Sequence, residues 1–177
     1  MARSRYKIFD TAKPHFLTCT VVQWIKLFDY KELRQVVVDS LNFMVKHDRL
    51  QIYAYVIMPN HTHLIALSDQ LAKEMASFKS FTARKIIDTL KSQKENFILK
   101  RLAECKLKFK HDRTYQVWQE GSHPQEIQNE AMMLQKIDYI HYNPVRAGYV
   151  EDPIEWIYSS ARDYNDIKGP IEVNTDW

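Results

Sequence analysis

The order of strand-like and helix-like segments is the feature that most restricts the fold of this chain. Residues 16–22 (FLTCTVV) are rich in β-branched and aromatic residues, which predicts a first strand. Residues 30–47 carry apolar side chains at helical spacing, which predicts a helix. Residues 50–58 and 61–67 are two further strand-like runs, and the Pro-Asn turn signal between them predicts an antiparallel hairpin.

The second half of the chain continues this alternation. It predicts, in order, helices at 71–90 and 97–106, a short strand at 115–118, a final helix at 129–142 that stops at Pro144, and an aromatic segment at 156–164 that packs back on the body. The order β-α-β-β-α-β followed by a helix is that of a ferredoxin-like split βαβ sheet. We therefore expect an α+β fold, an antiparallel sheet with helices on one face and a further C-terminal helix, in one domain spanning residues 1–177.

Composition excludes several classes of protein. The chain has only three glycines, too few for a glycine-rich phosphate loop, so we expect no nucleotide cofactor. No apolar run approaches the roughly 18 residues of a membrane span, and the basic start lacks the apolar stretch of a signal peptide. We therefore expect a cytoplasmic protein without membrane contact, in which Cys19 and Cys105 are reduced thiols.

The net charge of +3 is unevenly distributed. The stretch from Lys73 to Arg113 contains twelve Lys or Arg and five Asp or Glu, whereas acidic residues outnumber basic ones in the rest. A basic block of this kind predicts a polyanionic partner. A solvated helix surface explains the charge equally well, so charge alone does not decide.

Two histidines, His61 and His63, flank Thr62 on a predicted strand. Because side chains two residues apart on a strand point the same way, the two imidazoles are expected side by side, as in a metal site. On ligand chemistry alone, two imidazoles favour zinc-like ions. The alternative is a pair of surface histidines satisfied by hydrogen bonds.

The final helix carries a second group of candidates. Met133, Ile137 and Ile140 form one apolar stripe that fits packing on the sheet, whereas Tyr139 and Asn143 are i, i+4 neighbours on another face. A tyrosine hydroxyl is a possible nucleophile and an asparagine oxygen a metal ligand. The alternative is a half-buried packing tyrosine, which is common in a chain with ten tyrosines.

Four segments, in this order, resemble the single-tyrosine HUH transposases of the REP-associated type (RAYTs). They are residues 55–65 (YVIMPNHTHLI), 117–121 (VWQEG), 139–148 (YIHYNPVRAG) and 158–164 (YSSARDY). The family has a bulky hydrophobic residue between its two histidines, and Thr62 departs from that pattern. Since its side chain is expected to point away from the metal, we expect the site to survive the change.

The resemblance implies a metal-dependent endonuclease and strand transferase that cuts hairpin-associated single-stranded DNA. It matches Tyr139, on the C-terminal helix, to the nucleophile that forms a 5′-phosphotyrosine link. It matches His61, His63 and Asn143 to ligands of Mg²⁺ or Mn²⁺. The base that accepts the tyrosine proton is not identified by the sequence. A monomer that supplies its own tyrosine is favoured over a homodimer.

Single-stranded or hairpin DNA is thus the expected partner. The residues expected to contact it are Arg3, Arg5, Arg84, Lys85, Lys108, Lys110, Trp118, Gln119, Arg146 and Arg162. Two alternatives stay open: a hairpin-binding or repeat-binding protein that no longer cuts, and a small metal-dependent hydrolase unrelated to DNA.

Overall fold

A four-stranded antiparallel sheet organises the molecule, which is described by a computed structural model over residues 12–106 and 114–177. The strand order is β2-β3-β1-β4. The strands are β1 (His15–Thr20), β2 (Gln51–Met58), β3 (His61–Leu67) and β4 (Gln125–Glu126). β1 and β2 both pair with β3, and β4 pairs with the start of β1. The predicted ferredoxin-like order is confirmed, because the first strand lies between the third and the fourth.

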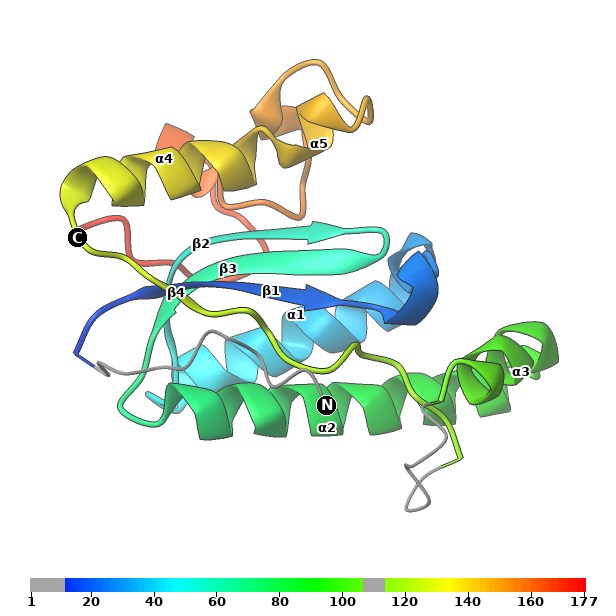
Figure 1. The fold of residues 1–177 in the computed structure, drawn as a ribbon. Helices are drawn as coiled ribbons and strands as arrows, with labels where there is room; N and C mark the ends of the chain where they lie inside the picture. Colours follow the sequence, from blue (N-terminus) through cyan, green and yellow to red (C-terminus); the bar gives the residue numbers. More distant parts are fainter. Residues whose placement is uncertain (1–11, 107–113) are drawn as a thin grey trace.

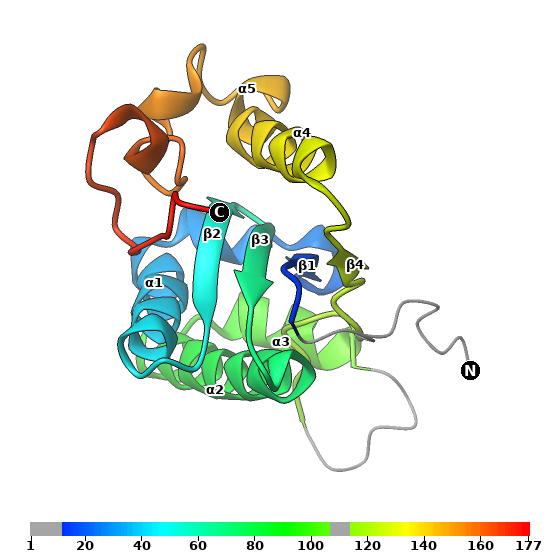
Figure 2. The ribbon, with the colours of Figure 1, turned by 90° about the vertical axis from the view of Figure 1, so that its left-hand side faces the viewer.

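Helices cover both faces of the sheet. They are α1 (Lys31–Lys46), α2 (Leu71–Ser92), α3 (Asn96–Glu104), α4 (Glu130–His141) and the short α5 (Asn143–Arg146). Figures 1 and 2 show α1 and α2 on one side of the sheet, with α4 on the other and α5 continuing from its end. Within the two described ranges, no helix combines the length and the apolar character needed to cross a membrane.

The alternation of side chains along the strands builds two cores. On β3, Leu64 belongs to the larger core beneath α1 and α2, whereas Ile65 belongs to the smaller core beneath α4. The predicted stripe of α4 is confirmed, since Met133, Ile137 and Ile140 are all buried in the smaller core. The histidines of β3 share the face of Ile65, so α4 lies over the face that carries them.

The predicted strand at 115–118 is wrong. That segment makes a single bridge, from Val21 to Trp118, and the fourth strand instead forms at Gln125–Glu126. Two polar residues carry no strand signal of their own, so this strand exists through its pairing with β1. The final helix also ends earlier than predicted, at His141, and Pro144 lies inside α5 rather than stopping a helix.

The aromatic segment at 156–164 packs back on the body, as predicted, and the structure shows that it does so along the free edge of β2. Ile57 N–H donates to the carbonyl of Tyr158 (2.9 Å), and Ser160 N–H donates to the carbonyl of Tyr55 (3.0 Å). Trp156 Nε1 donates to the carbonyl of Ile57 (3.1 Å). The C-terminal segment therefore pairs with the outer strand of the sheet (Figure 2).

Trp118 joins the 115–121 segment to α2 through a buried hydrogen bond. Its Nε1 donates to Thr82 Oγ1 (3.0 Å), and Thr82 Oγ1 donates to the carbonyl of Phe78 (2.7 Å). Thr82→Val keeps the shape but leaves the indole N–H without its acceptor. We expect the free energy of unfolding, measured by urea denaturation, to fall by about 1–3 kcal/mol. Thr82→Ser keeps the hydroxyl, so it should lower the free energy of unfolding less than Thr82→Val does. A larger decrease for serine than for valine would contradict a stabilising role of the hydroxyl.

Candidate active site

The two histidines stand at the beginning of β3, immediately after the turn from β2. Their ring centroids are 4.8 Å apart with an interplanar angle of 72°. Thr62, between them, is fully buried on the opposite face, paired in register with Cys19. The expectation that Thr62 points away from the imidazoles is confirmed, so the departure from the family pattern changes the α2 side of the sheet and not this site.

Each imidazole is oriented by a hydrogen bond at Nδ1. His61 Nδ1 lies 2.7 Å from Asn60 Oδ1, which accepts its proton. His63 Nδ1 lies 2.9 Å from Thr18 Oγ1 on the neighbouring strand. In both rings Nε2 is therefore the nitrogen left for a further ligand. Sequence reasoning missed Asn60 and Thr18; the position of Asn60 directly before the pair was the available signal.

Both imidazoles are held in the neutral form. Burial lowers the pKa of His61, and the neighbouring Asn143 side chain, acting as an acceptor, partly opposes that effect. Burial, reinforced by the nearby charges of His61 and Lys136, lowers the pKa of His63 to about 3. Neutral imidazole is the form that binds metal ions, so no proton has to be displaced at neutral pH.

The end of α4 brings the predicted tyrosine and asparagine to the histidines. The Tyr139 ring lies 5.2 Å from the His63 ring and edge-on to Phe16 at 5.9 Å, and the side chain is 40% exposed. Asn143, at the start of α5, has its side chain beside His61, close enough to raise the pKa of that imidazole. Although the helix is interrupted at Tyr142, all four predicted side chains meet at one place.

The donor set fits a divalent cation. In the described part of the chain, no three His, Cys, Asp or Glu side chains come close enough together to hold a metal. Here two neutral imidazoles and the amide oxygen of Asn143 converge, and the exposed Tyr139 leaves one side open to solvent. Three ligands with open positions are typical of a catalytic rather than a structural metal centre.

Two cationic side chains border this group. Arg146 Cζ lies 5.6 Å from the centroid of the Tyr139 ring, which supports its choice as a contact residue. Lys136, one turn before Tyr139, holds its ammonium 4.7 Å from the centroid of the Phe16 ring and helps to lower the pKa of His63. Sequence reasoning missed Lys136, although its i−3 position relative to Tyr139 could have pointed to it.

The predicted DNA-contacting residues divide into several groups. Arg84 and Gln119 line one groove of about 550 Å³ between α2 and residues 115–121. Lys85 is exposed on α2, beside Phe81. Arg162 donates to the carbonyl of Ile154 and is partly buried. Four others, Arg3, Arg5, Lys108 and Lys110, lie outside the described residues.

The expectation that Trp118 contacts DNA is wrong. Its side chain is only 6% exposed, packs on Phe28 and Phe78, and uses its N–H internally. Burying the large apolar indole stabilises the fold more than exposing it would. If Trp118 were on the surface, residues 115–121 would lose their anchor to α2.

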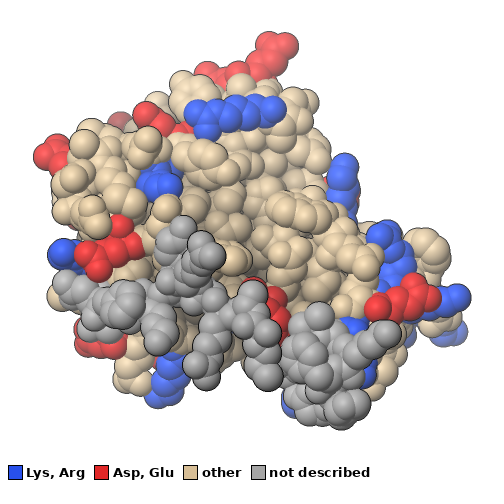
Figure 3. Space-filling model, viewed as in Figure 1, with Lys and Arg blue, Asp and Glu red and all other residues tan. Residues whose placement is uncertain are grey.

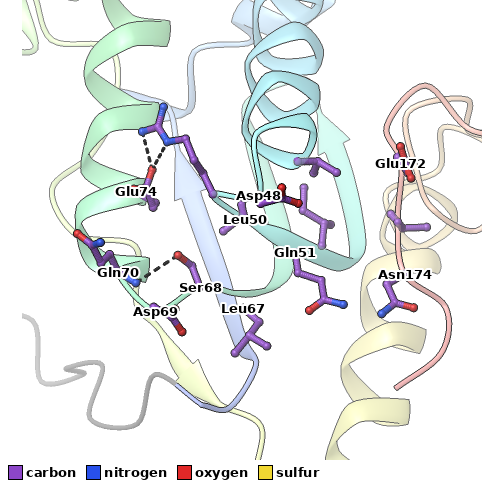
Figure 4. Close-up of a pocket in the computed structure, with 14 residues that line it drawn as sticks. Asp48, Leu50, Gln51, Leu67, Ser68, Asp69, Gln70, Glu74, Glu172 and Asn174 are labelled. Atoms are coloured by element: carbon purple, nitrogen blue, oxygen red, sulfur yellow. Dashed lines mark hydrogen bonds and ion pairs between the residues drawn. The ribbon is translucent and has the colours of Figure 1, made fainter.

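Charge is not concentrated over the sheet. On the face shown in Figure 3, Lys and Arg side chains are scattered around an uncharged central area. A cavity of about 670 Å³ lies at the far end of β3, about 20 Å from His61 along the strand. Its walls carry Asp48, Asp69 and Glu172 (Figure 4), so it suits a polyanion poorly.

Comparison with known proteins gives the family. No protein-family model matches the chain. A protein of Haemophilus influenzae described as a REP-associated tyrosine transposase is 30% identical over 139 residues, which are 75% of this chain and 69% of that protein. The chain belongs to the REP-associated tyrosine transposase family.

A solved structure of a REP-associated tyrosine transposase, bound to a REP hairpin, has the same fold. The TM-score is 0.62 at 22% sequence identity, over 99% of this chain and 95% of that one. At this identity the likeness establishes the family fold. The α+β architecture with its antiparallel sheet is therefore that of the transposase family.

Proposed function

We propose that this protein is a metal-dependent endonuclease and strand transferase that cuts hairpin-associated single-stranded DNA through a 5′-phosphotyrosine intermediate. The observation that carries the proposal is the convergence of Tyr139 on His63 and of Asn143 on His61. A nucleophile and three ligands thus come from one chain, which favours a monomer that acts alone. The family, and a relative's binding of a REP hairpin, support DNA as the substrate.

The reaction follows from the chemistry of these groups. The Tyr139 hydroxyl gives up its proton as its oxygen attacks phosphorus, the P–O3′ bond breaks, and the leaving oxygen takes up a proton to become a free 3′-hydroxyl. His61, His63 and Asn143 would hold Mg²⁺ or Mn²⁺, which when bound supplies positive charge to the scissile phosphate. Arg146, whose Cζ lies 5.6 Å from the centroid of the Tyr139 ring, places a positive charge near the phosphate under attack.

The covalent link preserves the energy of the broken bond. A second 3′-hydroxyl can attack the phosphotyrosine, release Tyr139 and rejoin the DNA, so strand transfer needs no nucleotide cofactor. The exposure of Tyr139 permits a DNA strand to reach its hydroxyl from solvent. Burial of His63 beneath it keeps the ligand side of the site ordered.

The test is a search for a covalent adduct. Labelled DNA hairpins with varied unpaired flanks are incubated with the protein and Mn²⁺ or Mg²⁺, then resolved on a denaturing protein gel. We expect a labelled protein band that a chelator removes. Salt-sensitive binding without any adduct would replace the proposal with a DNA-binding protein that does not cut. Absence of DNA binding altogether would favour the hydrolase unrelated to DNA.

A further inference from the structure

Trp24 is exposed although the segment around it is firmly buried. It ends the 3₁₀ turn η1 (Val22–Trp24), which leads into a second turn, η2 (Leu27–Asp29). Its neighbours Val22, Ile25 and Leu27 are buried, whereas Trp24 is 57% exposed. Tryptophan is usually highly buried in a folded chain, and it is enriched among the residues that dominate binding energy at interfaces. Figure 1 shows this segment directly after β1, at the end of the sheet where β2 turns into β3.

The backbone that presents Trp24 is strained. Gln23 and Trp24 have φ angles of 48° and 56°, in the left-handed region that residues with a side chain rarely adopt. Hydrogen bonds from Trp24 N–H to Val21 and from Ile25 N–H to Val22 close the turn (3.1 and 3.2 Å). Strain of this kind persists only where the surroundings hold it, and it is frequent at binding sites.

The same turn is bonded to the turn that precedes the histidines. Val21 N–H donates to the carbonyl of Asn60 (2.9 Å), and Phe28 N–H donates to the carbonyl of Pro59 (2.8 Å). Asn60 uses Nδ2 on the carbonyl of Trp24 (3.4 Å) and Oδ1 on His61 Nδ1 (2.7 Å). Trp24 and His61 are therefore fixed relative to each other by one asparagine side chain.

The indole stands at the rim of the candidate site. Its centroid lies 5.9 Å from that of His61, with an interplanar angle of 75°, so the contact uses an edge and not two stacked faces. Nearby, Lys26 holds its ammonium 6.0 Å from the ring of the exposed Tyr149, which packs on Trp156 at 5.4 Å. Aromatic faces interleaved with cations are the usual platform for a single nucleic-acid strand.

We propose that Trp24 stacks on an unpaired base of the DNA strand next to the scissile phosphate, and so sets which phosphate reaches Tyr139. The inference rests on the proposed function, because it assumes a DNA strand at His61 and His63. Trp24 is a positioning residue in this scheme, since it touches a base and not the reacting atoms. Lys26, two positions after Trp24 and exposed like it, supplies positive charge for the phosphate next to the stacked base.

The experiment measures whether Trp24 senses a base. The probes are DNA hairpins with an unpaired oligo(dT) tail on the 5′ or the 3′ side, carrying one abasic nucleotide at successive tail positions. Binding is measured by fluorescence anisotropy over a salt series for the wild-type protein, Trp24→Ala and Trp24→Phe. The matched control is Trp177→Ala, a change of another exposed tryptophan whose indole bonds to Tyr164, at the opposite end of the molecule (Figure 1).

We expect Trp24→Ala to weaken binding of the intact tail about 5- to 100-fold, the range for loss of one stacked base. Trp24→Phe should retain most of the affinity and Trp177→Ala all of it. At one tail position, an abasic nucleotide should weaken binding to the wild-type protein by the same factor. On that abasic tail, Trp24→Ala should bind as well as the wild type. The salt dependence should not change, since no charge is removed.

Two results would overturn the inference alone: unchanged affinity in Trp24→Ala, or an equal loss on every abasic tail. Either result, with the metal-dependent adduct still formed, leaves the proposed function intact. A wild-type protein that binds no hairpin and forms no adduct would overturn both. Thermal unfolding of each variant, compared with the wild type, separates a lost contact from a lost fold.

Discussion

Tyr139→Phe is expected to abolish the covalent protein–DNA adduct and to lower DNA cleavage by at least about 10³-fold. The Tyr139 side chain is 40% exposed, and its hydroxyl forms no hydrogen bond with the described residues. Removing that one oxygen should therefore leave the fold unaffected. Binding to hairpin DNA should survive, because the ring and the neighbouring Arg146 stay in place. Adduct formation on a denaturing gel and cleavage of a labelled strand are the two readouts.

Tyr142→Phe is the matched control for this change. Tyr142 is one turn away, 47% exposed, and sits at the junction of α4 and α5. It should form adduct at close to the wild-type rate. An adduct that persists in Tyr139→Phe and disappears in Tyr142→Phe would mean that the wrong tyrosine had been assigned as nucleophile.

His63→Ala is expected to have the second largest effect, on metal binding and cleavage together. It removes one of three candidate ligands, and we expect Mn²⁺ affinity, measured by calorimetry, and the cleavage rate each to fall on the order of 10²- to 10⁴-fold. High Mn²⁺ concentrations should recover part of the cleavage. Recovery would show that the loss arises from metal occupancy and not from misfolding.

Thr18→Val tests His63 through the residue that orients its imidazole. It removes the hydroxyl that lies 2.9 Å from His63 Nδ1 and leaves the imidazole itself in place. Loss of such a supporting hydrogen bond typically costs about 10- to 100-fold in metal affinity. No loss of metal affinity in either variant would contradict the assignment of His63 as a metal ligand.

The fold was predictable where a local pattern matched the tertiary role of a segment. The run at residues 61–67 became β3 with the same bounds, since alternation and a turn signal agreed there. β4 could not be predicted, because Gln125 and Glu126 have no strand propensity and pair only where β1 offers an edge. The prediction that Trp118 contacts DNA failed for a related reason. Only the tertiary surroundings of an indole decide whether it stacks on a base or packs in a core.

The site was predictable to the extent that spacing fixes geometry. A spacing of two residues on a strand was enough to group His61 with His63. A spacing of four residues near a helix end was enough to group Tyr139 with Asn143. That the two groups meet depends on how α4 crosses the sheet, which no spacing encodes. Asn60, Thr18 and Lys136 were missed for the same reason, and the chemical roles of all these residues stay predictions until the variants are measured.

The pairing of residues 158–160 with β2 has a consequence for self-association. An open strand edge is a template on which a second copy of a chain can add its own strand. At β2 that template is occupied by the chain itself, through Ile57 and Tyr55. The opposite border of the sheet is β4, which is two residues long. Among the described residues, the sheet therefore offers little free strand edge on which a second molecule could extend it.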